Sequence, residues 1–199
     1  MSKKGRKKGS IGKQSRALLL NIAAEEFANH GYYETKISTL VKRAGLTQPT
    51  FYLYFKSKEA IFQELIDLFI KGLSDLTNES RLESGIDFNS VPMRITKGLT
   101  GVLTFFSENQ NLTRIGFFNS VEAAEIKKQL AIQIRENLIS EVHNGYFKTE
   151  IDMNLIAEIL VGTIERLTIT TLFPGIKEPE EIASEIVHLF LHGMLLKNE

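Results

Sequence analysis

The stretch TKISTLVKRAGLTQPTFYLYFKSK, residues 35–58, has the pattern of two short helices joined by a tight turn. Within residues 36–44, apolar side chains recur at the three- and four-residue spacing of one helix face. Gly45 follows where the chain has to turn, and a second short helix is expected over residues 48–54. This arrangement predicts a helix-turn-helix.

Short polar side chains stand where these two helices are expected to begin. Thr35 precedes the first helix and Thr47 the second, and a threonine hydroxyl can accept a hydrogen bond from the free amides of a first turn. Pro49 falls inside the first turn of the second helix, where its missing N–H would have no partner. Cap chemistry and periodicity therefore predict the same helix starts.

The second helix divides its side chains between two faces. Phe51 and Phe55 lie one turn apart and are expected to point into the core. The opposite face and the helix exit carry polar groups: Gln48, Thr50, Tyr52, Tyr54, Lys56 and Lys58. Glutamine can form two hydrogen bonds to a base edge, while hydroxyl and ammonium groups reach phosphate oxygens. This face predicts a DNA-reading helix; a short polar surface helix over packed aromatics is the competing interpretation.

Charge is distributed unevenly along the chain, although the formal net charge is zero. Residues 1–58 contain 12 Lys and Arg against three acidic residues, a net charge of +9, and the remaining residues carry −9. Residues 1–14 have no acidic residue and are expected to form a flexible basic arm, with a simple solvated tail as the alternative. The asymmetry favours a polyanionic partner for the front part of the chain.

Helical periodicity extends on both sides of the opening stretch. An N-terminal helix is expected over residues 15–30, closed by Gly31. Further helices are expected over about residues 58–76, 91–106, 121–143, 153–173 and 179–196, with a linking segment at 112–119. Because strand alternation is almost missing, the predicted fold is all-α, with an N-terminal three-helix helix-turn-helix head followed by a C-terminal helical domain.

Composition restricts the class of protein further. The chain has 199 residues, of which 43% are hydrophobic and 24% charged, so an ordinary globular protein is expected. It has no cysteine, which excludes disulfides and thiolate chemistry. No apolar run reaches the roughly 18 residues of a membrane span, and no apolar signal segment follows the basic N-terminus. A soluble, cytoplasmic protein that needs no membrane partner is therefore expected.

The segment GYYETKISTLVKRAGLTQPTFYLYFKSKEAIF, residues 31–62, resembles the DNA-binding signature of the TetR (tetracycline-repressor-like) family of bacterial transcription regulators. The resemblance covers about residues 14–65. It implies base contacts from Gln48, Pro49, Thr50 and Ser38, and phosphate contacts from further residues of the same segment. The complete predicted DNA-binding set is Thr35, Lys36, Ser38, Thr47, Gln48, Pro49, Thr50, Tyr52, Tyr54, Lys56 and Lys58. Lys36 and Pro49 depart from the commonest family pattern, so the operator sequence stays open.

The resemblance also implies a domain division: residues 1–14 as the arm, 15–58 as the DNA-binding domain, and 59–199 as a ligand-binding and dimerisation domain. The family dimerises through its last two long helices, and the apolar surface of residues 153–173 agrees with burial on more than one side. A monomer core is the alternative. The family implies a repressor that binds a palindromic DNA operator as a homodimer and is released by a small effector.

A cluster of phenylalanines with polar neighbours is the predicted effector site, because apolar walls with a few polar groups are typical of ligand pockets. Plain core packing explains the same cluster equally well. The segment GTIERLTITTLF, residues 162–173, resembles the branch of the family that responds to fatty acyl-coenzyme A, and a multidrug-type sensor is an equal alternative. The predicted ligand-binding set is Phe105, Phe106, Arg114, Phe117, Phe118, Asn119, Glu122 and Glu165.

Other functional classes have little support in the sequence. No nucleophile elbow, zinc-protease motif or glycine-rich phosphate loop is found, so no enzyme and no cofactor are expected. Glu185 and His188 have the spacing of a di-iron helix motif, and His192 lies one turn further on, but no second copy of the motif exists. No metal site is therefore predicted. A DNA-binding protein of purely architectural function, without an effector, is the main rival.

Overall fold

The computed structural model describes residues 5–194, with side chains from residue 12 onward, and this part of the chain is helical without strands. The elements are α1 (Gly5–Glu34), α2 (Ile37–Arg43), α3 (Gln48–Tyr52), α4 (Lys58–Glu79), η1 (Phe88–Ser90), α5 (Val91–Glu108), α6 (Gln110–Thr113), η2 (Arg114–Asn119), α7 (Ala123–His143), α8 (Met153–Leu167), η3 (Thr168–Leu172) and α9 (Pro179–His192). The segments η2 and η3 are π-helical. The all-α prediction is confirmed.

The described chain folds into two compact units. The first unit contains the described residues up to Phe69 together with Asn111–Ala123, and the second contains Ile70–Gln110 together with the described residues from Ala124 onward. From the sequence, domain boundaries are expected after residue 14 and after residue 58. The division of the structure differs because the segment 111–123, which includes η2, packs on α1 of the first unit.

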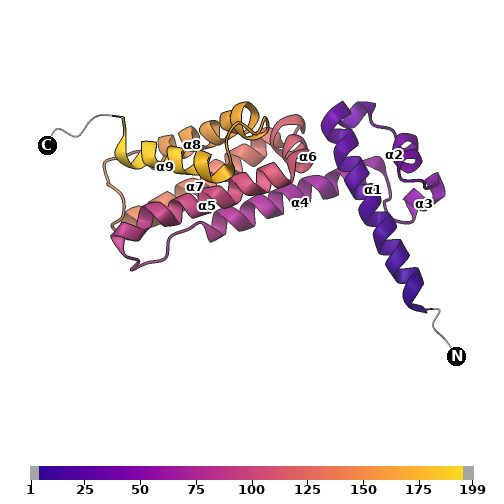
Figure 1. The fold of residues 1–199 in the computed structure, drawn as a ribbon, viewed down its shortest axis with the longest axis horizontal. Coiled ribbons are helices and arrows are strands. Elements are labelled where there is room, and N and C mark those ends of the chain that lie inside the picture. The colour runs from indigo at the N-terminus through magenta and orange to yellow at the C-terminus, as the bar shows by residue number, and fades with distance from the viewer. Residues whose placement is uncertain (1–4, 195–199) are drawn as a thin grey trace. The chain divides into compact units, whose positions relative to one another are not determined.

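The core of the first unit is built from α1 to α4 and η2. In Figure 1 the helices α2 and α3 lie beside α1, and α2 contacts both of the others. The fully buried large side chains of this unit are Leu19, Phe27, Leu40, Phe51, Ile61, Leu65, Ile66, Phe69, Ile115 and Phe117. Phe51, predicted to point inward from the helix after the turn, is therefore a core residue.

The N-terminal helix differs from the prediction at its start. It begins at Gly5 instead of Ser15, so residues 5–14 of the expected flexible arm are helical, while residues 1–4 lie outside the described part. Lysine, arginine and glutamine are good helix formers, which is consistent with the longer helix. Gly31 has a φ of 78° and leaves the helical conformation, as predicted for the residue that closes the helix, and a further helical stretch to Glu34 follows it.

The second unit is a bundle in which α5 packs along α9 and η3 packs against both α5 and α8. Asp152 caps α8 through its carboxylate, which accepts a hydrogen bond from the Asn154 amide at 2.9 Å, as predicted. Helices α4 and α5 approach closely where Gly72 meets Phe105, since a Cβ on Gly72 would lie 2.6 Å from the ring. None of the helices in the described residues is long and apolar enough to cross a membrane.

Candidate nucleic-acid interface and ligand cavity

The turn between α2 and α3 is held by backbone hydrogen bonds. Gly45 has a φ of 64°, a left-handed conformation that glycine adopts without steric cost. The Leu46 amide donates to the Val41 carbonyl at 2.8 Å, which closes the end of α2. The Thr47 hydroxyl accepts a hydrogen bond from the Thr50 amide at 3.4 Å and so caps α3, as predicted. Local chemistry thus sets the angle at which α3 leaves α2.

Helix α3 presents its polar residues to solvent. Phe51 is buried in the core, as is Phe55 just beyond the helix end, whereas Gln48 and Pro49 are exposed at the first turn. Tyr52 is 55% exposed on the same helix. The other predicted contacts that are exposed or half-buried are Lys36, Ser38, Thr47, Thr50, Tyr54 and Lys56. Together with Gln48, Pro49 and Tyr52, these residues lie between the start of α2 and the start of α4, and we call this predicted set the reading surface.

Two of the residues predicted to contact DNA, Thr35 and Lys58, form hydrogen bonds within the protein instead. Thr35 is 1% exposed, and its hydroxyl donates to the Gly31 carbonyl at 2.8 Å. It does not cap α2, whose N-cap is Lys36 without a side-chain hydrogen bond. The Lys58 ammonium donates to the carbonyls of Tyr32 at 2.8 Å and Thr35 at 3.0 Å. Both side chains therefore satisfy backbone oxygens that become unpaired where α1 ends.

Lys58 is one of several cations of the first unit that have internal partners. Arg16 bonds Glu64 at 2.6 and 2.8 Å and lies 4.8 Å from the centre of the Phe55 ring. Arg43 bonds Glu25 and Glu26, and hydrogen bonds to these two carboxylates raise the pKa of the Arg43 guanidinium. The positive charge available for an external partner is therefore smaller than the formal count for residues 1–58.

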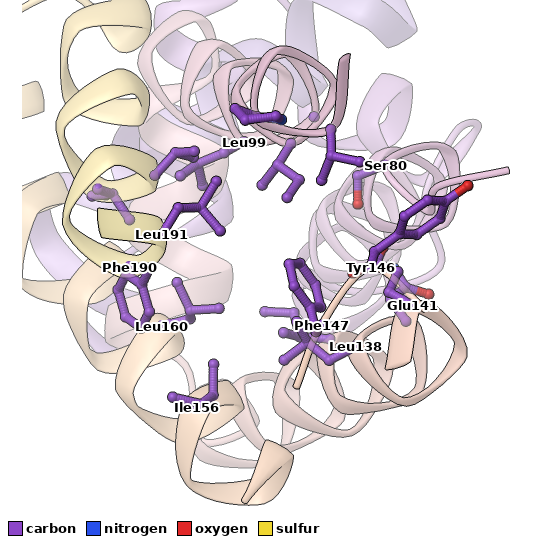
Figure 2. Close-up of a pocket in the computed structure, with 18 of the residues that line it drawn as sticks. Ser80, Leu99, Leu138, Glu141, Tyr146, Phe147, Ile156, Leu160, Phe190 and Leu191 are labelled. Carbon is purple, nitrogen blue, oxygen red and sulfur yellow. The ribbon is translucent and has the colours of Figure 1, made fainter. Parts of the chain in front are cut away.

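The second unit encloses a cavity of about 490 Å³. Helices α4, α5, α7, α8 and α9 and the stretch after α7 line it, and most of the lining side chains are apolar. Figure 2 shows Phe190 and Leu160 on one side of the space and Phe147 and Leu138 nearer the other. A cavity of this volume and lining falls within the usual range of small-molecule sites.

Glu141 is the acidic residue in the lining of this cavity. Its side chain is 5% exposed, and one carboxylate oxygen accepts a hydrogen bond from the Leu82 amide at 3.3 Å. Burial raises the pKa of Glu141 to about 7, against the opposing effects of the Leu82 amide and the Arg81 charge. Figure 2 places Glu141 beside Tyr146, across the space from Phe190.

None of the eight residues predicted to bind the effector lines this cavity. Phe106 and Phe117 are fully buried, one in each unit, and belong to the two cores. The Phe105 ring covers Gly72, and Phe118 contacts Phe117 edge-on. The remaining four, which have polar or charged side chains, are Arg114, Asn119, Glu122 and Glu165.

The described polar contacts of the predicted effector residues lie within their own units. Asn119 donates to the Ala28 carbonyl at 3.3 Å, and Glu165 pairs with Lys127 at 2.7 Å. The aliphatic residues that do line the cavity, such as Ile95 and Leu99 on α5, have the helical spacing of core residues. No pattern in the sequence separates a residue that lines a cavity from one that fills a core.

Two histidines of α9 lie one turn apart near the C-terminal end of the described chain. The rings of His188 and His192 have their centres 4.9 Å apart, while Glu185 pairs with Lys177. Among the described residues, no group of three His, Cys, Asp or Glu side chains could hold a metal ion.

Comparisons with known proteins agree with the geometry of the first unit. The family model for bacterial regulatory proteins of the tetR family matches residues 19–65. An uncharacterized HTH-type transcriptional regulator of Bacillus subtilis, YdgC, is 47% identical over 94% of this chain and 96% of its own length. The fatty acid metabolism regulator protein of the same organism is 25% identical over 88% of this chain and 93% of its own.

Solved structures with the same fold superpose on nearly the whole chain. The TetR family regulator PfmR of Thermus thermophilus superposes with a TM-score of 0.72 at 24% identity, covering 89% of this chain and 99% of its own. FadR of Bacillus subtilis, solved in complex with stearoyl-CoA, superposes with a TM-score of 0.66 at 21% identity, covering 90% of this chain and 99% of its own.

Proposed function

Because the chain belongs to the tetR family of bacterial regulatory proteins and is a DNA-binding transcriptional regulator, we propose that it acts as a homodimeric repressor released from its operator by a small lipophilic molecule. The observation that carries the DNA-binding part is the exposed polar face of α3, held at a fixed angle by the Gly45 turn and the Thr47 cap. Gln48 and Thr50 on its first turn would read bases, and Tyr52, Tyr54 and Lys56 would contact phosphates.

The homodimer is supported by an apolar face on α8. Leu155 and Ile159 are 57% and 44% exposed. Gly162 follows on the same helix face, and a Cβ at this position would have no neighbour within 4 Å among the described residues. Leu189 on α9 is 48% exposed. Helices that leave large apolar side chains in solvent are typical of surfaces covered by a partner. A second copy of the chain packing on α8 and α9 would bring two reading surfaces to one palindrome.

The lipophilic effector is supported by the apolar cavity of the second unit. The similarity to a fatty acid metabolism regulator and to a structure that contains stearoyl-CoA favours a ligand with a long apolar chain. Helix α4 supplies Phe69 to the first core and Thr77 to the cavity lining, so a shift of α4 is the proposed route from ligand to DNA. A 100-fold preference for the DNA-free state corresponds to about 2.7 kcal/mol and would be an effective switch.

Gln48→Ala tests the reading surface. The operator is first selected from random DNA with the wild-type protein, and affinity for it is then compared with a scrambled duplex by fluorescence anisotropy. We expect the variant to lose about 1–3 kcal/mol of discrimination, since a glutamine that bonds a base edge in two places contributes that much. Binding to scrambled DNA should change little, and Gln129→Ala on α7 is the matched control. Unchanged discrimination would remove Gln48 from the reading surface.

Native mass spectrometry of the purified protein tests the dimer and the effector together. A dimer that carries an additional mass, released on denaturation, supports both parts of the proposal. A monomer at micromolar concentration contradicts the palindrome mechanism. Stable operator binding that no lipophilic compound changes would favour an architectural DNA-binding protein, which is the alternative.

A further inference from the structure

We propose that the cavity of the second unit selects lipophilic molecules that carry a cationic amine, with the Glu141 carboxylate as the group that binds the amine. The inference rests on the proposed function, in that it takes this cavity to be the effector site, and it names the charge of the effector. It differs from the acyl-coenzyme A expectation, which requires an anionic head group.

Glu141 is a buried acid with little internal compensation. Its side chain is 5% exposed, and its described hydrogen bond comes from the Leu82 amide at a distance of 3.3 Å. Within residues 12–194, Glu141 forms none of the ion pairs that the structure contains. Burying a carboxylate without a cation costs several kcal/mol, which is why acids in such surroundings bind protons or cationic partners.

The polar neighbours of Glu141 in the lining form their described hydrogen bonds with other groups. The Ser80 hydroxyl and the Asn137 amide both donate to the Thr77 carbonyl, at 2.8 and 2.9 Å. The Tyr146 hydroxyl donates to the Glu83 carbonyl at 3.1 Å and accepts from the Ile86 amide at 2.9 Å. None of these contacts involves the Glu141 carboxylate, so a cationic ligand that enters the cavity would supply a strong donor that this carboxylate lacks among its described contacts.

The other charged groups around the cavity lie in solvent. Lys148 and His192 belong to the lining and are exposed, which weakens their attraction for an anionic head group through screening. Arg81 precedes the buried Leu82, and its guanidinium donates to the Ser140 hydroxyl at 2.7 Å. Glu141 is therefore the buried charged residue of the lining, and its charge is negative.

The effect of the head group on binding can be tested with three ligands that share a ten-carbon chain. These ligands are decylamine, decanol and decanoate, each used below its micellar concentration. Isothermal titration at pH 8 should show decylamine binding at least about tenfold more tightly than the other two, since a charge-assisted hydrogen bond in a dry site contributes about 1.5–3 kcal/mol. The preference should decrease towards pH 6, because the raised pKa of Glu141 makes the carboxyl group neutral there while the amine keeps its charge.

Glu141→Gln is the decisive variant because it keeps the side-chain shape and removes the charge. It should lose the preference for decylamine and its pH dependence, while decanol binding stays within about twofold. Glu136→Gln, an exposed change of the same kind on α7, should keep both. Retention of the pH dependence in Glu141→Gln would show that another group causes it and would overturn the inference.

The outcomes distinguish the inference from the function on which it rests. If decanol binds but decylamine has no advantage, or if decanoate binds more tightly, the cavity remains a lipophilic site and the amine inference is wrong. If none of the three ligands binds to the folded wild-type protein, the assignment of this cavity as the effector site fails as well.

Discussion

Lys56 and Lys58 are two residues apart and have the same chemistry, yet the structure separates their roles. Lys56 is exposed on the reading surface, whereas the Lys58 ammonium donates to carbonyls at the end of α1 and lies 4.3 Å from the centre of the Tyr32 ring. An ammonium engaged by carbonyl oxygens and an aromatic face has few donors left for a phosphate. We therefore expect Lys58 to hold the first unit together.

The pair of variants Lys58→Met and Lys56→Met tests this division. Lys58→Met should lower the free energy of unfolding by about 1.5–3 kcal/mol, because part-buried carbonyls lose a charged donor. Lys56→Met should leave the melting temperature unchanged and make the salt dependence of DNA binding shallower by about one unit in the logarithmic slope. Thermal melts and anisotropy at several salt concentrations measure both. Equal melting temperatures in the two variants would contradict the structural role of Lys58.

Glu141 also makes stability depend on pH. The pKa of its carboxyl group is about 7 in the folded protein against a reference value of 4.5, so the folded state holds the proton more tightly. Stability from this group is complete below pH 4.5 and is lost as the pH rises to about 7, a difference on the order of 3 kcal/mol. Glu141→Gln should therefore gain stability relative to the wild type between pH 5 and pH 8 in chemical denaturation. A constant difference would contradict the raised pKa.

The π-helical segment η2 depends on one glycine for its packing. Gly116 faces the Phe69 ring so closely that a Cβ would lie 2.2 Å from a ring carbon, and Phe69 is itself fully buried. The segment contacts α1, and Asn119 adds a hydrogen bond to the Ala28 carbonyl. Through this contact a part of the chain far from α1 in sequence becomes part of the first unit.

Gly116→Ala should destabilise the protein by about 1–3 kcal/mol, since a methyl group has no room beside a buried ring. Gly101→Ala in α5 is the matched control, because its Cβ would meet Leu76 at an ordinary distance of 3.5 Å. The control should be neutral or stabilising by up to about 1 kcal/mol, as alanine favours a helix. Denaturant titration of both variants measures the contrast, and equal effects would show that Phe69 can move aside.

The assembled regulator is expected to read two half-sites at once. Two-fold helix-turn-helix dimers place their recognition helices in successive major grooves about 34 Å apart. Insertion of about half a helical turn of DNA between the half-sites turns the second one to the opposite side of the duplex. Affinity should fall to that of an isolated half-site, measured by anisotropy against the unmodified operator. Affinity that does not depend on spacing would indicate chains that bind independently.

Local features of this protein were predictable from its sequence. The Gly45 turn, the Thr47 and Asp152 caps and the burial of Phe51 follow from a glycine, two short polar side chains and a helical spacing, each acting over a few residues. The exposed face of α3 was predictable for the same reason, because one face of a short helix is buried when the other carries polar groups. The predicted start of α1 was wrong, since helix ends depend on small propensity differences.

The uses of Thr35, Lys58 and Glu141 were decided only by the tertiary structure. Each use depends on another part of the fold. Thr35 and Lys58 bond carbonyls at the end of α1, and Glu141 lines the cavity between five helices. Apolar residues on α5 that line the cavity obey the same periodicity as those that fill a core. Periodicity indicates which face of a helix is buried. A cavity forms where several buried faces do not come into contact, and the spacing between those faces is set only when the helices pack together.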